Sequence, residues 1–170
     1  MSNLENIHQT YNQFDRYLRL LDRSVLSPGF PIQEEDVAEI HSHAANYLCI
    51  LVSGALETDV IQMLSDYIGS SQSDEAKGEF LRMAKEKLPN PTIGGIKRVT
   101  RGVNKAWENH MEVLLGEHSR FRESIGALNT HRNSIAHGRE VKHLTMKNIR
   151  SYLESIGEFL VEFNKIIKAK

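Results

Sequence analysis

Apolar residues recur every three or four positions along almost the whole chain, and few segments alternate with a period of two. A 3.6-residue period gathers apolar side chains on one face of an α-helix, whereas a half-buried strand alternates. The pattern therefore predicts an all-α fold, a bundle of four to five main helices plus short connecting helices. Because 170 residues suffice for one core, we expect a single domain over residues 1–170.

The first half of the chain predicts two long helices. The first is expected over residues 4–26 and is ended by a segment that contains two prolines and a glycine. The second is expected to start at residues 34–36, where three carboxylates suit the positive end of the helix dipole, and to end at Gly69. Apolar residues cover most of its circumference between Ala44 and Leu56, which predicts a central helix.

The second half predicts shorter helices and one long final helix. A charged helix is expected over residues 74–88, and residues 93–114 are expected to form two pieces, because glycines interrupt that segment. A further helix should run from about Glu117 into residues 131–137, with Gly138 as its stop. Thr145 should start the last helix, which has the cleanest amphipathic pattern in the chain.

Composition excludes several classes of protein. The formal net charge of −1 argues against nucleic-acid binding through bulk charge alone, but a local basic site remains open. The single cysteine, Cys49, excludes an internal disulfide framework and a thiolate zinc site, and its apolar neighbours predict a small core residue. No signal peptide and no apolar run near the roughly 18 residues of a membrane span are visible. We therefore expect a soluble, cytoplasmic protein without a membrane partner.

The most informative stretch is His131-Arg132-Asn133-Ser134-Ile135-Ala136-His137-Gly138. On a helix, Arg132 falls within about 40° of the apolar stripe that includes Phe121 and Leu128. A buried arginine is costly unless it meets an anion or a polar cleft, so we expect the stripe to face a groove or a second subunit there. Asn133 and His137 share another face.

Arg132 and His137 lie about 140° apart around the helix and about 7.5 Å apart along it. One chain therefore does not easily aim both groups at one atom, whereas two chains meeting about a two-fold axis could bring both pairs to one cleft. The alternative is a solvated helix end, at which His137 favours the negative end of the dipole.

These residue types suit cleavage of RNA without a metal or another cofactor. A histidine with a pKa near 6.5 can take a proton from a ribose 2′-hydroxyl or give one to the leaving 5′-oxygen. An arginine fork can hold the phosphate and stabilise the charge that gathers on its oxygens. We assign His137 as general acid or base, Arg132 as phosphate clamp and Asn133 as the residue that positions them.

The run Arg132–Gly138 resembles the Arg-polar-three-residues-His signature of the HEPN superfamily, small helical domains of which many are ribonucleases. Residues 51–57 resemble the corresponding helix of the RiboL-PSP-HEPN subgroup, as does the order of residues 90–96, Trp107, the signature run and Tyr152. The resemblance covers roughly residues 35–168. It implies a homodimer with two motifs lining one cleft and metal-independent endoribonuclease activity, often as a toxin or phage-defence effector, with an antitoxin or defence-system protein as a further partner.

One position departs from the related toxins. Those paired with nucleotidyltransferase antitoxins carry a modified tyrosine two residues after the histidine, and here that position is Arg139. Regulation by that route is therefore not expected, although Arg139 could contact phosphate. Some HEPN domains bind RNA or nucleotides without cleaving them. A non-catalytic RNA- or protein-binding module, or a partner of a neighbouring nucleotidyltransferase or defence protein, therefore remains open.

Further residues are candidates for RNA contact. We predict such contacts for His131, which precedes the signature, for Arg139 and for Glu57 on the long helix; Asp59 is expected on a solvated face. Five residues that can carry positive charge follow the signature: Arg139, Lys142, His143, Lys147 and Arg150. They are either solvated residues around the start of the last helix or a rim that binds phosphate. The remaining histidines have no partner at metal-ligand spacing, so no metal site is expected.

Overall fold

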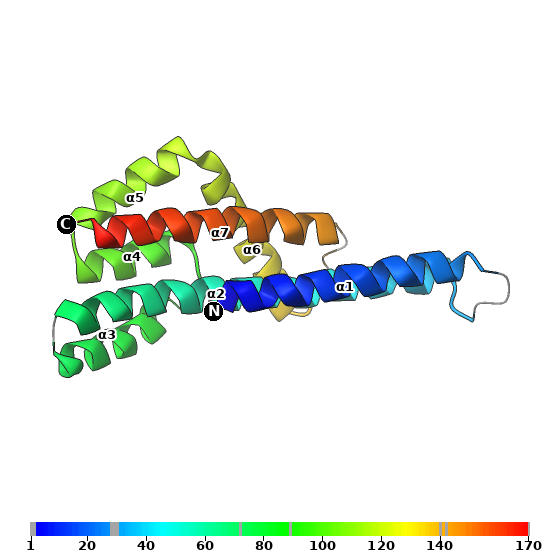
Figure 1. Ribbon diagram of the computed structural model, residues 1–170, viewed down its shortest axis with the longest axis horizontal. Helices are drawn as coiled ribbons and strands as arrows, with labels where there is room; N and C mark the ends of the chain where they lie inside the picture. The colour runs from blue at the N-terminus through cyan, green and yellow to red at the C-terminus, as the bar shows by residue number, and fades with distance from the viewer. Residues whose placement is uncertain are drawn as a thin grey trace.

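The computed structural model describes residues 3–27, 31–71, 73–88, 90–139, 141 and 143–169. These residues form seven helices and no strand (Figure 1). The helices are α1 (Asn3–Val25), α2 (Glu34–Ser71), α3 (Asp74–Lys87), α4 (Ile93–Val103), α5 (Ala106–Glu117), α6 (Ser119–Ala136) and α7 (Met146–Lys168). Four long helices and three short ones confirm the predicted all-α bundle.

Helix α2 is the centre of the bundle, as its apolar circumference predicted. It contacts α1, α3, α4, α6 and α7, and its middle is fully buried at Leu48, Val52 and Leu56. By length and composition alone α2 could also cross a membrane. More than half of its most apolar window is buried against the other helices, as in the core helix of a bundle.

Local signals set the helix ends where the sequence predicted them. The Thr145 hydroxyl accepts a hydrogen bond from Asn148 N (3.2 Å) and the Asn148 side chain accepts one from Thr145 N (3.0 Å), which makes a capping box at α7. The hydroxyl of Thr92 caps α4 by accepting from Gly95 N at 3.0 Å.

The predicted division of residues 93–114 is confirmed, but the break does not fall at a glycine. It lies at residues 104–105, where the side-chain oxygen of Asn104 accepts a hydrogen bond from Ala106 N at 3.0 Å. Gly95 instead permits a close approach, because a Cβ there would lie 2.8 Å from a methyl carbon of Leu88.

The expectation that Asp59 lies on a solvated face is wrong. Asp59 is 5% exposed, and its carboxylate accepts hydrogen bonds from Asn3 N (3.1 Å), Asn3 Nδ2 (2.8 Å) and Leu4 N (3.1 Å). The first amides of a helix have no partner within the helix, and here a residue of α2 supplies it. Asp59 therefore fixes the start of α1 on α2.

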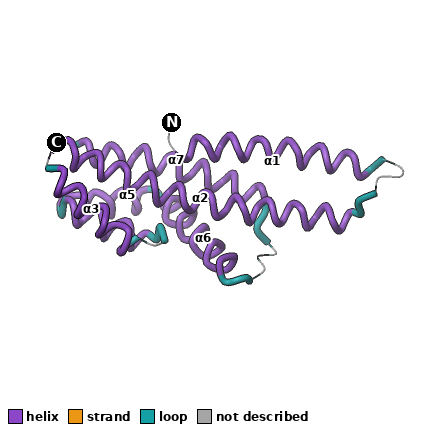
Figure 2. Tube along the Cα trace, turned by 90° about the horizontal axis from the view of Figure 1, so that it is seen from below, coloured by secondary structure: helices purple, strands orange, loops and turns teal. Residues whose placement is uncertain are grey.

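The bundle is not uniformly compact around α2 (Figures 1 and 2). Helix α1 and the first part of α2 run side by side and project beyond the other helices in both views (Figures 1 and 2). Helix α6 runs away from the plane of that pair (Figure 2).

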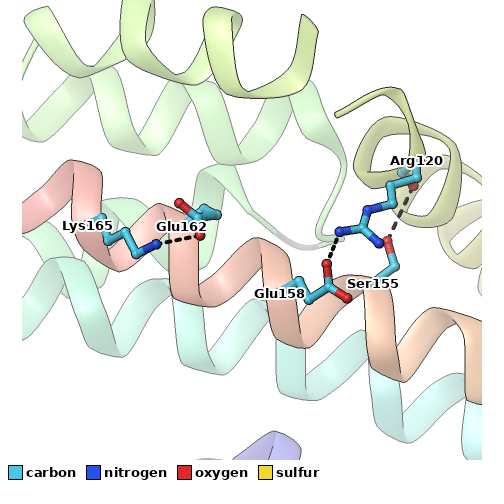
Figure 3. A network of polar contacts seen from close by, with 5 residues as sticks. All are labelled: Arg120, Ser155, Glu158, Glu162 and Lys165. Carbon is cyan, nitrogen blue, oxygen red and sulfur yellow. Dashed lines mark hydrogen bonds and ion pairs between the residues drawn. The ribbon is translucent and has the colours of Figure 1, made fainter. Parts of the chain in front are cut away.

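The start of α6 is fixed on α7 by polar and aromatic contacts. Arg120 forms an ion pair with Glu158, and the Ser155 hydroxyl donates to the Arg120 carbonyl at 3.4 Å (Figure 3). Phe121 packs edge-on against Phe159, with ring centroids 5.9 Å apart. These contacts set the direction of α6, whose other end carries residues 131–137.

Candidate functional site

Arg132 continues the buried stripe of α6, as its spacing predicted. Phe121, Ile125 and Leu128 are at most 1% exposed, and burial becomes partial at Arg132. The Cys49 thiol lies 3.8 Å from the Leu128 carbonyl, which brings α2 against α6 one turn before Arg132. Arg132 thus stands where the α2–α6 contact opens towards solvent.

The positive charge of Arg132 affects the pKa values of two residues of α2, Glu57 and Cys49. Burial raises the pKa of Glu57, and the positive charge of Arg132 opposes that rise. Burial raises the pKa of Cys49 to about 12, again opposed by Arg132, so the thiol stays protonated. Glu57 is therefore an acidic residue of α2 on which the charge of the partly buried arginine acts, whereas Cys49 is the core residue that the sequence predicted.

His131 is anchored between α6 and α7. Its Nδ1 lies 3.2 Å from the hydroxyl of Tyr152, and the two rings are 6.1 Å apart. Burial lowers the pKa of His131 and, as the largest cause, raises the pKa of Tyr152. Burial thus favours the neutral forms of both groups. The phenol of Tyr152 can then donate its hydrogen to Nδ1 of His131, which leaves the proton of the imidazole on Nε2 as a donor on the other side of the ring.

His137 occupies the opposite environment at the end of α6. It is the exposed C-cap residue, and its backbone N–H donates to the Asn133 carbonyl at 3.1 Å. Gly138 follows with φ +68°, its N–H donates to Ile135 O (3.0 Å), and Arg139 N donates to Ser134 O (2.9 Å). This pair of bonds closes the helix with a left-handed glycine and leaves the imidazole of His137 open to solvent.

Asn133 touches both principal residues. Its side-chain oxygen lies 3.4 Å from Arg132 Nη1, and its backbone carbonyl holds the N–H of His137. These contacts agree with a residue that positions the other two, and that role remains a prediction.

The basic residues after the signature fall into two groups. Arg139, His143 and Lys147 are exposed, and none has an ion-pair partner among the residues that the structure describes. Arg150 forms an ion pair with Glu154, in which Nε of the arginine and Oε1 of the glutamate are 3.0 Å apart. Lys142, which the sequence placed in the same rim, lies outside the described residues.

One chain presents these residues on an exposed helix end. Four hollows of about 340, 400, 470 and 510 Å³ lie elsewhere on the described surface, and none of these four is lined by a residue of the run 131–139. In the same described part of the chain, no three His, Cys, Asp or Glu side chains come together in a group that could hold a metal ion.

Sequence reasoning did not identify Tyr152 as the partner of His131. The separation of 21 residues gives no geometric signal, because the two residues lie on different helices. The proximity of Glu57 to Arg132 was likewise not derivable from spacing.

Comparison with known families adds an independent finding. The family model of RiboL-PSP-HEPN matches residues 30–169, which include α2 to α7 and the whole signature, while α1 lies before the match. Comparisons with curated proteins and with solved structures found no match. The match covers well over half of the chain and marks it as a HEPN-type, RNA-related module. The chain therefore belongs to the RiboL-PSP-HEPN family.

Proposed function

We propose that the protein is a cytoplasmic, metal-independent endoribonuclease of HEPN type that acts as a toxin or phage-defence effector. The observation that supports this most is the division of labour within one helix end. Arg132 is partly buried, where its charge acts on Glu57 of α2, and His137 is the exposed C-cap residue about one turn further on. A positioned cation and an accessible imidazole are the two groups that cleavage of a phosphodiester needs.

In the proposed reaction, His137 of one copy takes the proton of the ribose 2′-hydroxyl. The 2′-oxygen attacks phosphorus, the bond to the 5′-oxygen breaks, and a 2′,3′-cyclic phosphate forms. The departing 5′-oxygen takes a proton from the protonated His137 of the second copy. Arg132 donates hydrogen bonds to the phosphate oxygens, on which negative charge builds up.

Glu57 acts on this reaction through Arg132. A guanidinium carries five N–H donors, so Arg132 can be attracted by the charge of Glu57 and still offer donors to the phosphate. Fixing the fork in advance reduces the conformational entropy that would be lost on binding RNA. Asn133 assists from the next position of α6.

The proposal includes a homodimer, because one chain does not surround the site. The helical geometry separates Arg132 from His137, and the site stands on an exposed helix end rather than in one of the four hollows described above. A second copy about a two-fold axis would supply the opposite wall of the cleft. An antitoxin or defence-system protein is the further partner that we propose.

The test uses purified protein with single-stranded and structured RNA in the presence of EDTA. We expect the wild type to cleave RNA and to leave 2′,3′-cyclic phosphate ends, and His137→Ala to lose that activity. His110→Ala, an exposed histidine on α5, is the matched control and should cleave as the wild type does. Equal cleavage by wild type and His137→Ala, or by neither, contradicts the catalytic assignment.

A second candidate function is RNA binding without cleavage. The specific observation in its favour is that three exposed basic residues, Arg139, His143 and Lys147, follow the end of α6 closely in the chain. Phosphate contacts of this kind give an affinity that falls steeply with salt. Wild-type protein that retains RNA in a salt-dependent manner, and leaves it intact, would establish this alternative.

A further inference from the structure

The exposed apolar surface is concentrated on α1 and the first part of α2. Of the eight large apolar side chains that are exposed on the described surface, six lie on these helices or directly after α1: Tyr17, Leu20, Leu26, Ile40, Tyr47 and Ile50. Only Val113 and Val161 lie on other helices. Single exposed apolar residues are normal on a protein surface, but a cluster of this kind marks an interaction site.

A groove of about 400 Å³ runs between the two helices. We call it the α1–α2 face and define it by its apolar lining, which is Phe14, Tyr17, Leu18 and Leu21 of α1 with Ile40, Ala44 and Tyr47 of α2. The rings of Phe14 and Tyr47 are 5.8 Å apart. This part of the pair projects beyond the other helices, which therefore leave it uncovered (Figures 1 and 2). Tyrosines at the centre of such a face are typical of interfaces between proteins.

The two borders of the α1–α2 face carry opposite charge. On α1, Arg16 and Arg23 lie on one side of the helix with Leu20 between them, and neither arginine has an ion-pair partner among the described residues. On α2, Asp36 and Glu39 are exposed beside Ile40. Among the described residues Glu39 pairs only with His43, at 3.2 Å, and the Asp36 carboxylate accepts a hydrogen bond from the backbone N–H of Gln33 at 3.2 Å.

Two further acidic residues of α1, Asp15 and Asp22, have partners on this pair of helices. Asp15 pairs with Arg19 at 2.9 Å, and Asp22 meets His41 at 2.7 Å. The charges at the two borders are therefore positive on α1, at Arg16 and Arg23, and negative on α2, at Asp36 and Glu39, with an apolar strip between them.

We propose that the α1–α2 face binds the same face of a second copy of this chain, with α1 of each copy lying on α2 of the other, and that this contact holds together the single homodimer to which the proposed cleft belongs. A two-fold interface requires a surface that complements itself. Placing α1 on α2 brings Arg16 and Arg23 against Asp36 and Glu39 twice, whereas placing α1 on α1 opposes arginine to arginine. Helix α1 precedes the family match, so family membership does not account for this surface.

The inference concerns association alone and does not rest on RNA cleavage. Its failure can therefore be told apart from failure of the proposed function. Light scattering and sedimentation of the full chain should give a dimer for the wild type and equally for His137→Ala. A dimer that cleaves no RNA leaves the inference standing and removes the proposed activity.

Charge reversal tests the arrangement. The variant Arg16→Glu/Arg23→Glu should be monomeric at concentrations where the wild type is dimeric, with association weakened at least about tenfold. The variant Asp36→Lys/Glu39→Lys should behave in the same way. In an equimolar mixture the two variants should recover a dimer that contains one copy of each, because each then meets opposite charge on both borders.

The control is Arg98→Glu/Lys105→Glu, which makes the same charge change at exposed residues away from the face and should remain dimeric. Recovery in the mixture also demonstrates that both variants are folded, and circular dichroism checks each one alone. The inference is overturned by a wild type that is monomeric throughout, by charge variants that stay dimeric, or by a mixture of folded variants that stays monomeric.

Discussion

The two ends of the signature run, Arg132 and His137, differ in the contacts that fix their positions. Arg132 is half-buried, and its charge acts on Glu57 and Cys49 of a helix far away in sequence. His137 is exposed, and the contacts that fix its backbone come from its own helix end. The tertiary structure therefore places the proposed phosphate clamp, whereas local chain geometry places the proposed acid and base. Substitutions at the two ends should consequently separate stability from activity.

The largest expected effect is on activity at the exposed end. We expect His137→Ala to lower the rate of RNA cleavage by about 10²- to 10⁴-fold, the contribution typical of a general acid or base. The free energy of unfolding should change by less than about 0.5 kcal/mol, because the side chain is exposed. Cleavage assays and urea unfolding measure the two quantities. A large loss of stability would show that this end depends on contacts beyond its own helix.

At the partly buried end, activity and stability should fall together. We expect Arg132→Ala to reduce cleavage by about 10²- to 10³-fold, as for loss of a donor to a charged transition state. The free energy of unfolding should fall by about 1 kcal/mol, because the packing of a half-buried side chain is lost and Glu57 loses a positive charge that acts on it.

The double variant Arg132→Ala/Glu57→Gln separates these two effects. It should recover much of the stability, since no half-buried carboxylate remains unpaired, and should recover none of the cleavage. Restored cleavage in the double variant would rule out Arg132 as the phosphate clamp.

The helix end itself should depend on one backbone angle. We expect Gly138→Ala to lower the free energy of unfolding by about 1–2 kcal/mol, because an alanine disfavours φ +68°. A Cβ at Gly138 would have no heavy atom within 4 Å, so strain is the only cost. Gly126→Ala, in the middle of α6 and equally free of contacts, is the control and should stabilise by about 0.5–1 kcal/mol. Equal effects of the two substitutions would contradict the assignment.

The smallest expected effect is a pH dependence at His131. Burial lowers the pKa of this residue in the folded state, so the unfolded chain binds the proton more readily. Its contribution to stability should therefore be complete above the unfolded pKa of about 6.5 and should fall as the pH drops through the lower, folded pKa.

Unfolding midpoints of wild type and His131→Gln, compared from pH 5 to pH 8, isolate this contribution. We expect the difference between the two proteins to change mainly below about pH 6.5. His143→Gln, at an exposed position, should show no such change. A difference that is constant with pH would contradict burial of His131.

The helices were predictable because their ends depend on nearby residues. Thr145 caps α7 through Asn148 three positions away, and Gly138 stops α6 within the same turn. The centrality of α2 followed from the fraction of its circumference that is apolar. The break between α4 and α5 was misplaced onto glycines because two of them, Gly95 and Gly102, serve close packing against Leu88 and Met83 instead.

The site was predictable only in part. Spacing placed Arg132 on the buried stripe, and the resemblance to HEPN domains pointed to Glu57, but the period of a helix does not say which other helix covers a face. The link from His131 to Tyr152 and the burial of Asp59 depend on how helices pack. Each of these contacts joins residues that are more than twenty positions apart in sequence.

The hydrogen bonds of Asp59 also limit how far this chain can be shortened from its N-terminus. The family match begins at residue 30, yet the core continues into α1 through Leu4, Ile7 and Tyr11. A fragment that starts at residue 30 would leave the buried carboxylate without its three donors and would uncover the surface of α2 and α7 beneath those side chains. We therefore expect that the start of the family match, at residue 30, does not separate two units that unfold independently. Helix α1 should melt together with the helices that it precedes.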